Sequence, residues 1–184
     1  MAVKTFTTGE VLTAADTNTY LNNGGLVYVK SQTIGSAVSS VTVSDAFSAT
    51  YDNYRIVING GTCSTNTALN MTLGSTATGY TQIGIYSQIT VGTVLTYNDT
   101  NTTSWASVAY CSANNIYGTI EIHDPYNAKW TVFDGIAMQA VAAGYVNLPA
   151  GFLTNTTSYT AFTLTTGAGT LTGGTITVYG YRKA

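Results

Sequence analysis

The sequence predicts an all-β protein, an antiparallel jelly-roll-like β-sandwich preceded by a short N-terminal helix. Three observations lead to this prediction. After residue 25 the chain is a series of short segments rich in β-branched and aromatic residues, several of which alternate apolar and polar side chains. Clusters of glycine, asparagine and aspartate separate these segments as turns. Helical signals are confined to the first 25 residues.

The N-terminal helix is expected from Ala14 to Leu21. Thr13 can cap it, and Asp16 lies three residues later, where a carboxylate meets free backbone N–H groups. About two turns of helix do not persist alone in water, so its apolar side chains should pack against something. Two partners remain open, namely the chain's own β-domain and a docking surface on another protein or a symmetry mate. The side chains concerned are Val11, Leu12, Ala15, Tyr20 and Leu21.

Short strands separated by turns should make up the rest of the chain. They are expected at residues 26–33, 38–43, 54–59, 67–73, 80–91, 105–111, 117–123, 130–146 (as one hairpin), 158–165 and 175–181. Eight to ten strands at this spacing indicate a sandwich or jelly roll. The flexible Gly24-Gly25 pair marks a boundary between an N-terminal segment, residues 1–25, and one β-domain, residues 26–184.

The composition points to a component of an assembly. Only 8% of the 184 residues are charged, far below the roughly 25% of an ordinary soluble domain, while 45% are hydrophobic. Surfaces normally carry their charged residues in water. We therefore expect much of this surface to be covered by other subunits or formed by hydroxyl and amide groups.

Charge and hydropathy argue against two classes of partner. The net charge is −2 and the chain has six Lys and Arg residues, too few for a phosphate-binding surface, so no nucleic acid is expected. No apolar run approaches ~18 residues, so no membrane insertion is expected. The N-terminus does not read as a signal peptide, which favours assembly in a cytoplasm. Cys63 and Cys111 can form a disulfide, but without an export signal buried thiols are favoured.

The sequence predicts neither an enzyme nor a cofactor or metal site. His123 is the single histidine, and it reads as the end of a strand leading into the Asp124-Pro125 turn. The acidic residues are scattered, although Glu121 can still meet Asp134 or Asp124 in space as a glycosidase-type pair. Neither a calcium loop nor a phosphate-binding glycine loop is present.

Aromatic residues are the most distinctive candidates for a binding role. The chain has 14 Tyr and two Trp, and the section of residues 79–105 carries several of them among Thr, Asn and Gln. Rings beside amides and hydroxyls suit glycan contact, with Tyr80, Tyr86, Tyr97 and Trp105 as candidates. In the alternative interpretation Tyr86 and Trp105 belong to the core and the polar section is a plain loop.

Several motifs resemble those of one group of proteins. The lead-in reads Phe6-x-x-Gly9-Glu10-Val11-Leu12, then Thr13-Ala14-Ala15-Asp16 and Asn18-x-Tyr20-Leu21. It is similar to the N-terminal motif of small tail-fibre or minor structural proteins of tailed bacteriophages, the latter including head fibres and capsid decoration proteins. Three β motifs, at residues 47–58, 118–125 and 174–182, resemble strands of domains in the same proteins.

The resemblance implies a homotrimeric jelly-roll-like domain displayed on a virion, with residues 1–25 attaching to other virion proteins and with assembly in the host cytoplasm. In a tail fibre or adhesin the domain would contact host surface glycans. A capsid decoration protein or head fibre is the alternative, because the chain has no long shaft of coiled-coil heptads or β-helix repeats. A glycan depolymerase is a third reading.

Overall fold

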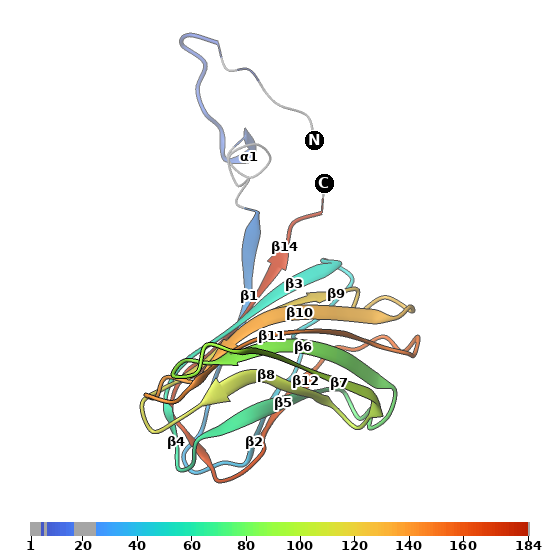
Figure 1. The fold of residues 1–184 in the computed structure, drawn as a ribbon. Coiled ribbons are helices and arrows are strands. Elements are labelled where there is room, and N and C mark those ends of the chain that lie inside the picture. Colours follow the sequence, from blue (N-terminus) through green and yellow to red (C-terminus); the bar gives the residue numbers. More distant parts are fainter. Residues whose placement is uncertain (1–4, 6, 17–24, 184) are drawn as a thin grey trace.

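A computed structural model describes residues 5, 7–16 and 25–183 (Figure 1). Apart from one short helix its regular structure is β-strand, and the strands pair antiparallel. The predicted all-β antiparallel class is thus confirmed. The described part of the N-terminal segment extends away from the β-domain, on the side where β1 begins and β14 ends.

The elements follow one another along the chain with short connections. They are α1 (Ala14–Asp16), β1 (Leu26–Thr33), β2 (Ser40–Val43), β3 (Asn53–Gly60), β4 (Thr62–Cys63), β5 (Thr67–Leu73), β6 (Tyr80–Gln88), β7 (Val94–Thr102), β8 (Trp105–Cys111), β9 (Ile116–His123), β10 (Thr131–Met138), β11 (Tyr145–Leu153), β12 (Phe162–Thr166), β13 (Leu171–Thr172) and β14 (Thr175–Tyr181).

The predicted cap of the N-terminal helix is present. The Asp16 N–H donates to Thr13 Oγ1 at 3.1 Å, and the Thr13 N–H donates back to the Asp16 carboxylate at 3.1 Å. This reciprocal pair is a capping box, here with Asp in place of Glu. The described helix ends at Asp16, and the remainder of the predicted helix, with Tyr20 and Leu21, lies outside the described residues.

Twelve strands form one branched sheet, and β9 is the branch point. One path runs β2-β12-β5-β8-β9-β10-β11-β6-β7, while β3, β14 and β1 continue from β9 in a second direction. The smaller group β2-β12-β5-β8 thus meets the larger group at β9, and Figure 1 shows β5 and β8 lying below β10 and β11. The separate pair β13-β4 completes the described strands.

Aromatic side chains from the two groups meet in the core. Trp105 of β8 lies 4.4 Å from the ring of Phe133 of β10 and 5.1 Å from that of Tyr80 of β6. Phe47 contacts Tyr54 of β3 and Phe162 of β12 in the same way. Alternate residues of the strands point inward, for example in the buried–intermediate pattern of β9, which is why period-two alternation in the sequence located many strands.

Strand β7 lies where no strand was expected, between the predicted strands at residues 80–91 and 105–111, and it corrects the interpretation of this polar section as a plain loop. Val94–Thr102 pairs with β6 and lies at the end of the sheet path. Polar side chains are common on edge strands because they discourage pairing with a further strand. Asn98 and Asp99, which read as turn residues, accordingly sit within a strand. Strand β6 correspondingly ends at Gln88.

The predicted hairpin of residues 130–146 exists, but its second strand is longer and starts later. Strand β11 runs from Tyr145 to Leu153 and contains Pro149, which pairs in register with Gly84 of β6. A proline inside a central strand is rare because it cannot donate to the ladder, and so the sequence pattern ended the strand too early. Strands β4 and β13 have two residues each, too few for a periodic signal.

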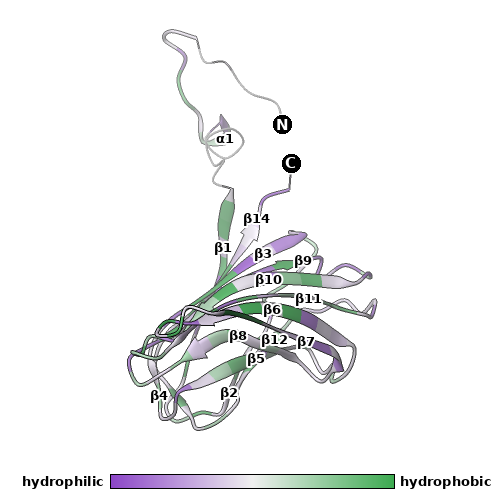
Figure 2. Cartoon of the chain, in the orientation of Figure 1, coloured by the Kyte–Doolittle hydropathy of each residue, from purple (hydrophilic) through white to green (hydrophobic). Residues whose placement is uncertain are grey.

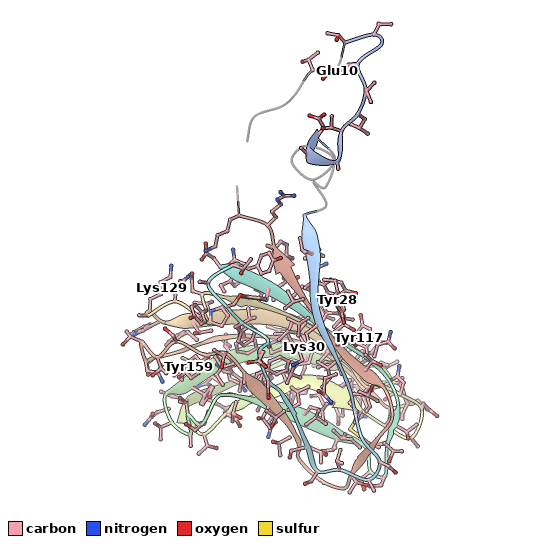
Figure 3. The ribbon with its side chains drawn as sticks, turned by 180° about the vertical axis from the view of Figure 1, so that it is seen from behind. Glu10, Tyr28, Lys30, Tyr117, Lys129 and Tyr159 are labelled. Atoms are coloured by element: carbon pink, nitrogen blue, oxygen red, sulfur yellow. A yellow bond between two sulfur atoms is a disulfide. The ribbon has the colours of Figure 1, made fainter. Side chains whose placement is uncertain are left out.

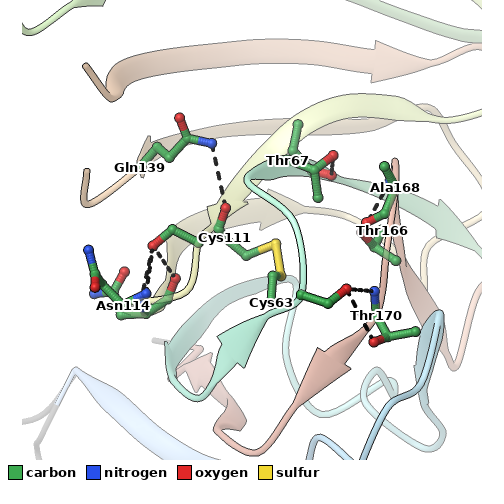
Figure 4. The surroundings of a disulfide bond; sticks show 12 residues. Cys63, Thr67, Cys111, Asn114, Gln139, Thr166, Ala168 and Thr170 are labelled. Atoms are coloured by element: carbon green, nitrogen blue, oxygen red, sulfur yellow. Dashed lines mark hydrogen bonds between the residues drawn. A yellow bond between two sulfur atoms is a disulfide. The ribbon is translucent and has the colours of Figure 1, made fainter. Parts of the chain in front are cut away.

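The cysteines form a disulfide, and the prediction of two buried thiols is wrong (Figure 4). Cys63 of β4 bonds to Cys111 at the end of β8, with a Cα–Cα distance of 5.7 Å. The Cys63 N–H donates to the Ser112 carbonyl at 2.8 Å, which holds the two segments together. The close approach of these segments arises from tertiary pairing across 48 residues, which spacing alone does not reveal.

We expect this disulfide to contribute strongly to stability. The bond closes a loop across a separation of 48 residues, so Cys63→Ser with Cys111→Ser should lower the free energy of unfolding by about 2–4 kcal/mol. Urea titration of the two proteins measures the difference, and dithiothreitol should shift only the wild-type curve. Labelling of both cysteines by iodoacetamide in the unfolded, unreduced protein would contradict the bond.

Candidate functional site

The described N-terminal segment presents apolar side chains to solvent. Val11 is 79% exposed, Leu12 is 48% exposed and Ala15 is also exposed. Within the segment, Thr7 donates to the Glu10 carboxylate and Thr13 donates to the Asp16 carboxylate, both at 3.1 Å. Figure 3 shows Glu10 far from the labelled side chains of the β-domain, such as Lys30 and Tyr117. In the described residues, therefore, the predicted docking side chains do not pack against the β-domain.

A second exposed apolar surface covers one face of the large sheet. Ile85 pairs with Leu148 and Met138 with Val146, so these side chains lie side by side on the same face of β10, β11 and β6. Figure 2 shows apolar colouring along β6 and β10. We call this surface the outer apolar face, and it consists of Ile83, Ile85, Val94, Val132, Ile136, Met138, Val146 and Leu148.

Contiguous exposed apolar side chains such as these indicate an interaction surface. The eight side chains of the outer apolar face are each between 36% and 65% exposed. Soluble monomers rarely present contiguous apolar patches of more than a few hundred Å², and larger ones mark interaction surfaces. Sequence reasoning missed this face because its residues come from four strands and each strand alone reads as an ordinary half-buried strand.

Charged groups gather beside the outer apolar face, on β3 and β9. Arg55 pairs with Glu121 across these strands, and the Tyr181 hydroxyl donates to the same carboxylate at 2.8 Å. The hydrogen bond and charge of Glu121 raise the pKa of Arg55 above its usual value. His123 contacts Asn53 at 3.0 Å and Asp134 at 3.4 Å.

The candidate carboxylate pair meets in this charged group. Asp134 of β10 lies directly opposite Glu121 of β9 in the register, as the sequence left open. One Glu121 oxygen accepts from Arg55 and the other from Tyr181, so each oxygen of this carboxylate has a partner within the charged group. Asp124 pairs instead with Lys129 at 2.9 Å.

Two of the four glycan candidates are core residues. Tyr80 and Trp105 have no exposed surface, so a direct contact with a glycan is left to Tyr86 and Tyr97. The Tyr80 hydroxyl accepts from the Leu73 N–H at 2.7 Å, and burial raises the pKa of Tyr80 to about 12. The alternative interpretation of Trp105 as a core residue is therefore the correct one.

Tyr86 and Tyr97 line a groove on the opposite side of the larger strand group from the outer apolar face. We call it the tyrosine groove; its volume is about 680 Å³ and it lies between β6, β7 and β11 on one side and β5 and β8 on the other. Its lining residues are Asn66, Thr67, Tyr86, Tyr97, Asp99, Ala106, Ser107, Tyr110, Gln139 and Tyr145. This volume is typical of pockets for small ligands.

The position of Tyr97 is set by a glycine and an asparagine. Gly84 lies beneath the ring, and a Cβ at this position would come within 2.1 Å of Tyr97 Cε1. Asn147 donates through Nδ2 to the Tyr97 hydroxyl and to the Ser107 carbonyl, both at 3.0 Å. Burial raises the pKa of Tyr97 above its usual value, and it does the same for Tyr110.

Sequence reasoning missed Tyr110 and Tyr145. Both lie on strands that the pattern assigned, but they follow Tyr86 by 24 and 59 residues along the chain. Only the pairing of β11 with β6 brings Tyr145 beside Tyr86, with ring centroids 6.0 Å apart. The sequence held one weak signal for the side of the sheet on which the groove lies. Tyr86 directly follows Ile85 in a strand, so the two side chains must point to opposite faces.

Within the described ranges, 5, 7–16 and 25–183, no group of three or more His, Cys, Asp and Glu residues is arranged to hold a metal ion. No helix in the part of the chain that the structure describes is long and apolar enough to span a membrane. No model of a known protein family matches the chain, and no curated protein matches its sequence.

Proposed function

We propose that this chain is a structural protein of a bacteriophage virion, a surface-displayed module attached to the particle by its N-terminal segment. The observation that carries the proposal is the exposure of Val11 and Leu12 on a segment that extends away from the β-domain. Apolar side chains in such a position lower their free energy by docking elsewhere. The resemblance of residues 5–21 to phage attachment motifs supports the same reading.

The β-domain of this module is a jelly-roll-like sandwich that assembles as a homotrimer. The meeting of a four-strand group and an eight-strand group around one aromatic core supports the sandwich. The outer apolar face supports self-association, because it would leave water on contact with another copy. The low charge of the chain fits a surface that is covered in this way.

The module acts as a tail fibre or adhesin that contacts host surface glycans. Tyr86 and Tyr97 are the sequence-predicted contact residues that line a groove. The alternative is a capsid decoration protein or head fibre, which the compact β-domain favours because the described chain holds no shaft between the attachment segment and the domain. In either case the chain has no catalytic role and requires no cofactor.

Incorporation into particles tests the attachment. We expect Val11→Asp with Leu12→Asp to abolish incorporation, because two charges would be buried at the docking surface. Both side chains are exposed, so the melting temperature of the isolated protein should not change. Quantitative mass spectrometry of purified particles gives the copy number, and the matched control is Thr8→Asp at an exposed polar position of the same segment.

The copy number per particle also distinguishes a tail fibre from a capsid decoration protein. A handful of copies per particle supports a tail fibre, and tens to hundreds support a decoration protein. Wild-type levels of the double variant in particles would refute attachment through Val11 and Leu12. Unfolding of the double variant would instead mean that the segment belongs to the β-domain.

A further inference from the structure

We propose that the tyrosine groove binds a neutral saccharide whose sugar ring lies on the Tyr86 and Tyr97 side chains. The inference rests on the proposed host-contacting function and gives that function a site and a ligand class. It follows from three properties of the groove, which are its row of aromatic rings, its fixed polar groups and its charge.

The four tyrosines form a continuous row. Tyr97 lies 6.1 Å from Tyr86, Tyr86 lies 6.0 Å from Tyr145, and Tyr145 stacks on Tyr110 at 6.2 Å. Each ring is supported by a neighbour, so binding costs little side-chain entropy. A row of rings suits the apolar C–H faces of an extended sugar chain. A quaternary ammonium group would instead need rings placed around it.

Polar groups of the groove are held in fixed positions. The Asp99 carboxylate accepts from Gln82 Nε2 at 2.8 Å, and Gln82 Oε1 in turn accepts from the Ala106 N–H at 2.8 Å. Tyr97 accepts from Asn147, which leaves its own O–H able to donate. Sugar hydroxyls both donate and accept, so they can pair with a carboxylate and a phenol side by side.

The charge of the groove excludes acidic ligands. Its ten lining residues include Asp99 and no Lys, Arg or His. A sialylated or sulfated sugar would meet a carboxylate with no cation to offset it, and a desolvated like-charge contact is unfavourable. A neutral hexose or N-acetylhexosamine oligomer brings hydroxyls without this penalty.

A glycan array carrying neutral, sialylated and sulfated oligosaccharides, probed with the full chain, tests the ligand class. We expect binding to neutral oligomers of glucose, galactose, mannose or N-acetylglucosamine, with affinities that calorimetry finds insensitive to added salt. Choline chloride is the competing probe, because a cation would also be attracted to Asp99. Binding of choline or of acidic sugars in preference, or of no probe at all, overturns the proposal.

Three variants test the site. Tyr86→Ala should weaken saccharide binding by roughly tenfold or more, since it removes one of the two inner rings of the row. Gly84→Ala should do the same with every ring retained, because the added Cβ displaces Tyr97. Tyr28→Ala is the matched control, since Tyr28 is 61% exposed and belongs to an aromatic pair with Tyr179 outside the groove.

The outcomes keep the two proposals apart. Saccharide binding that survives both groove variants overturns the site, whatever the copy number in particles. Circular dichroism melting of each variant identifies loss through unfolding. In that case Tyr97→Phe, which keeps the ring and removes the hydroxyl that is able to donate to a sugar, should still weaken binding. If the test of attachment through Val11 and Leu12 gave a negative result, the result for saccharide binding in the groove would not be affected.

Discussion

Ile85→Asp combined with Leu148→Asp is expected to convert the proposed homotrimer to a monomer in solution. These two side chains face each other across β6 and β11, at the centre of the outer apolar face, and each is 48% exposed. A stable interface buries about 800 Å² per partner, and its central residues carry most of the binding energy. Two carboxylates there would be desolvated without cations, at a cost of several kcal/mol.

Analytical ultracentrifugation at micromolar concentration measures the change. Ser36→Asp with Ser44→Asp adds the same charge at exposed positions outside the face and should leave the oligomer intact. Both substituted apolar side chains point outward, so the monomer should keep its circular dichroism spectrum. A wild-type protein that sediments as a monomer at high concentration would refute self-association through this face.

Trp105→Ala is expected to lower the free energy of unfolding by about 3–5 kcal/mol, the cost typical of removing a large buried aromatic side chain. Trp105 is fully buried, packs on Phe133 and Tyr80, and donates through Nε1 to the Phe152 carbonyl at 3.3 Å. Its removal would leave a cavity between the two strand groups.

Urea denaturation followed by circular dichroism tests this expectation. Trp105→Phe should cost markedly less, because it keeps an aromatic ring against Phe133 and loses only the N–H and part of the volume. The matched surface control is Trp130→Ala, since Trp130 is 54% exposed and stacks on Phe152 alone among the ring contacts. Equal losses for Trp105→Ala and Trp130→Ala would contradict the core position of Trp105.

Local patterns were sufficient where one strand has one buried face. The predicted bounds of β1, β5, β8 and β14 agree with the structure because alternation and flanking turn residues are properties of the segment itself. The alternation pattern failed where pairing with a neighbouring strand decides whether a segment is a strand. Strand β7 was missed because its polar residues read as a loop, and β11 was ended too early because Pro149 read as the end of a strand, although both strands pair with β6.

The same contrast between local sequence pattern and tertiary contacts applies to the candidate sites. The exposure of Val11 and Leu12 was open in the sequence, and so was the meeting of Glu121 with Asp134, since each depends on contacts beyond the segment. Of the four aromatic candidates, Tyr80 and Trp105 entered the core while Tyr86 and Tyr97 entered the groove. The parity of a residue along its strand separates the two faces, but it does not say which face another layer covers.

The sequence by itself determined the all-β class, the capped N-terminal segment and the unusually low charge, because these follow from backbone preference and composition. Tertiary structure alone decided the Cys63–Cys111 bond, the outer apolar face and the tyrosine groove. Each of these joins residues from strands far apart in the chain. Their proximity is set by which strands pair and in what register, and that depends on the free energy of the whole core.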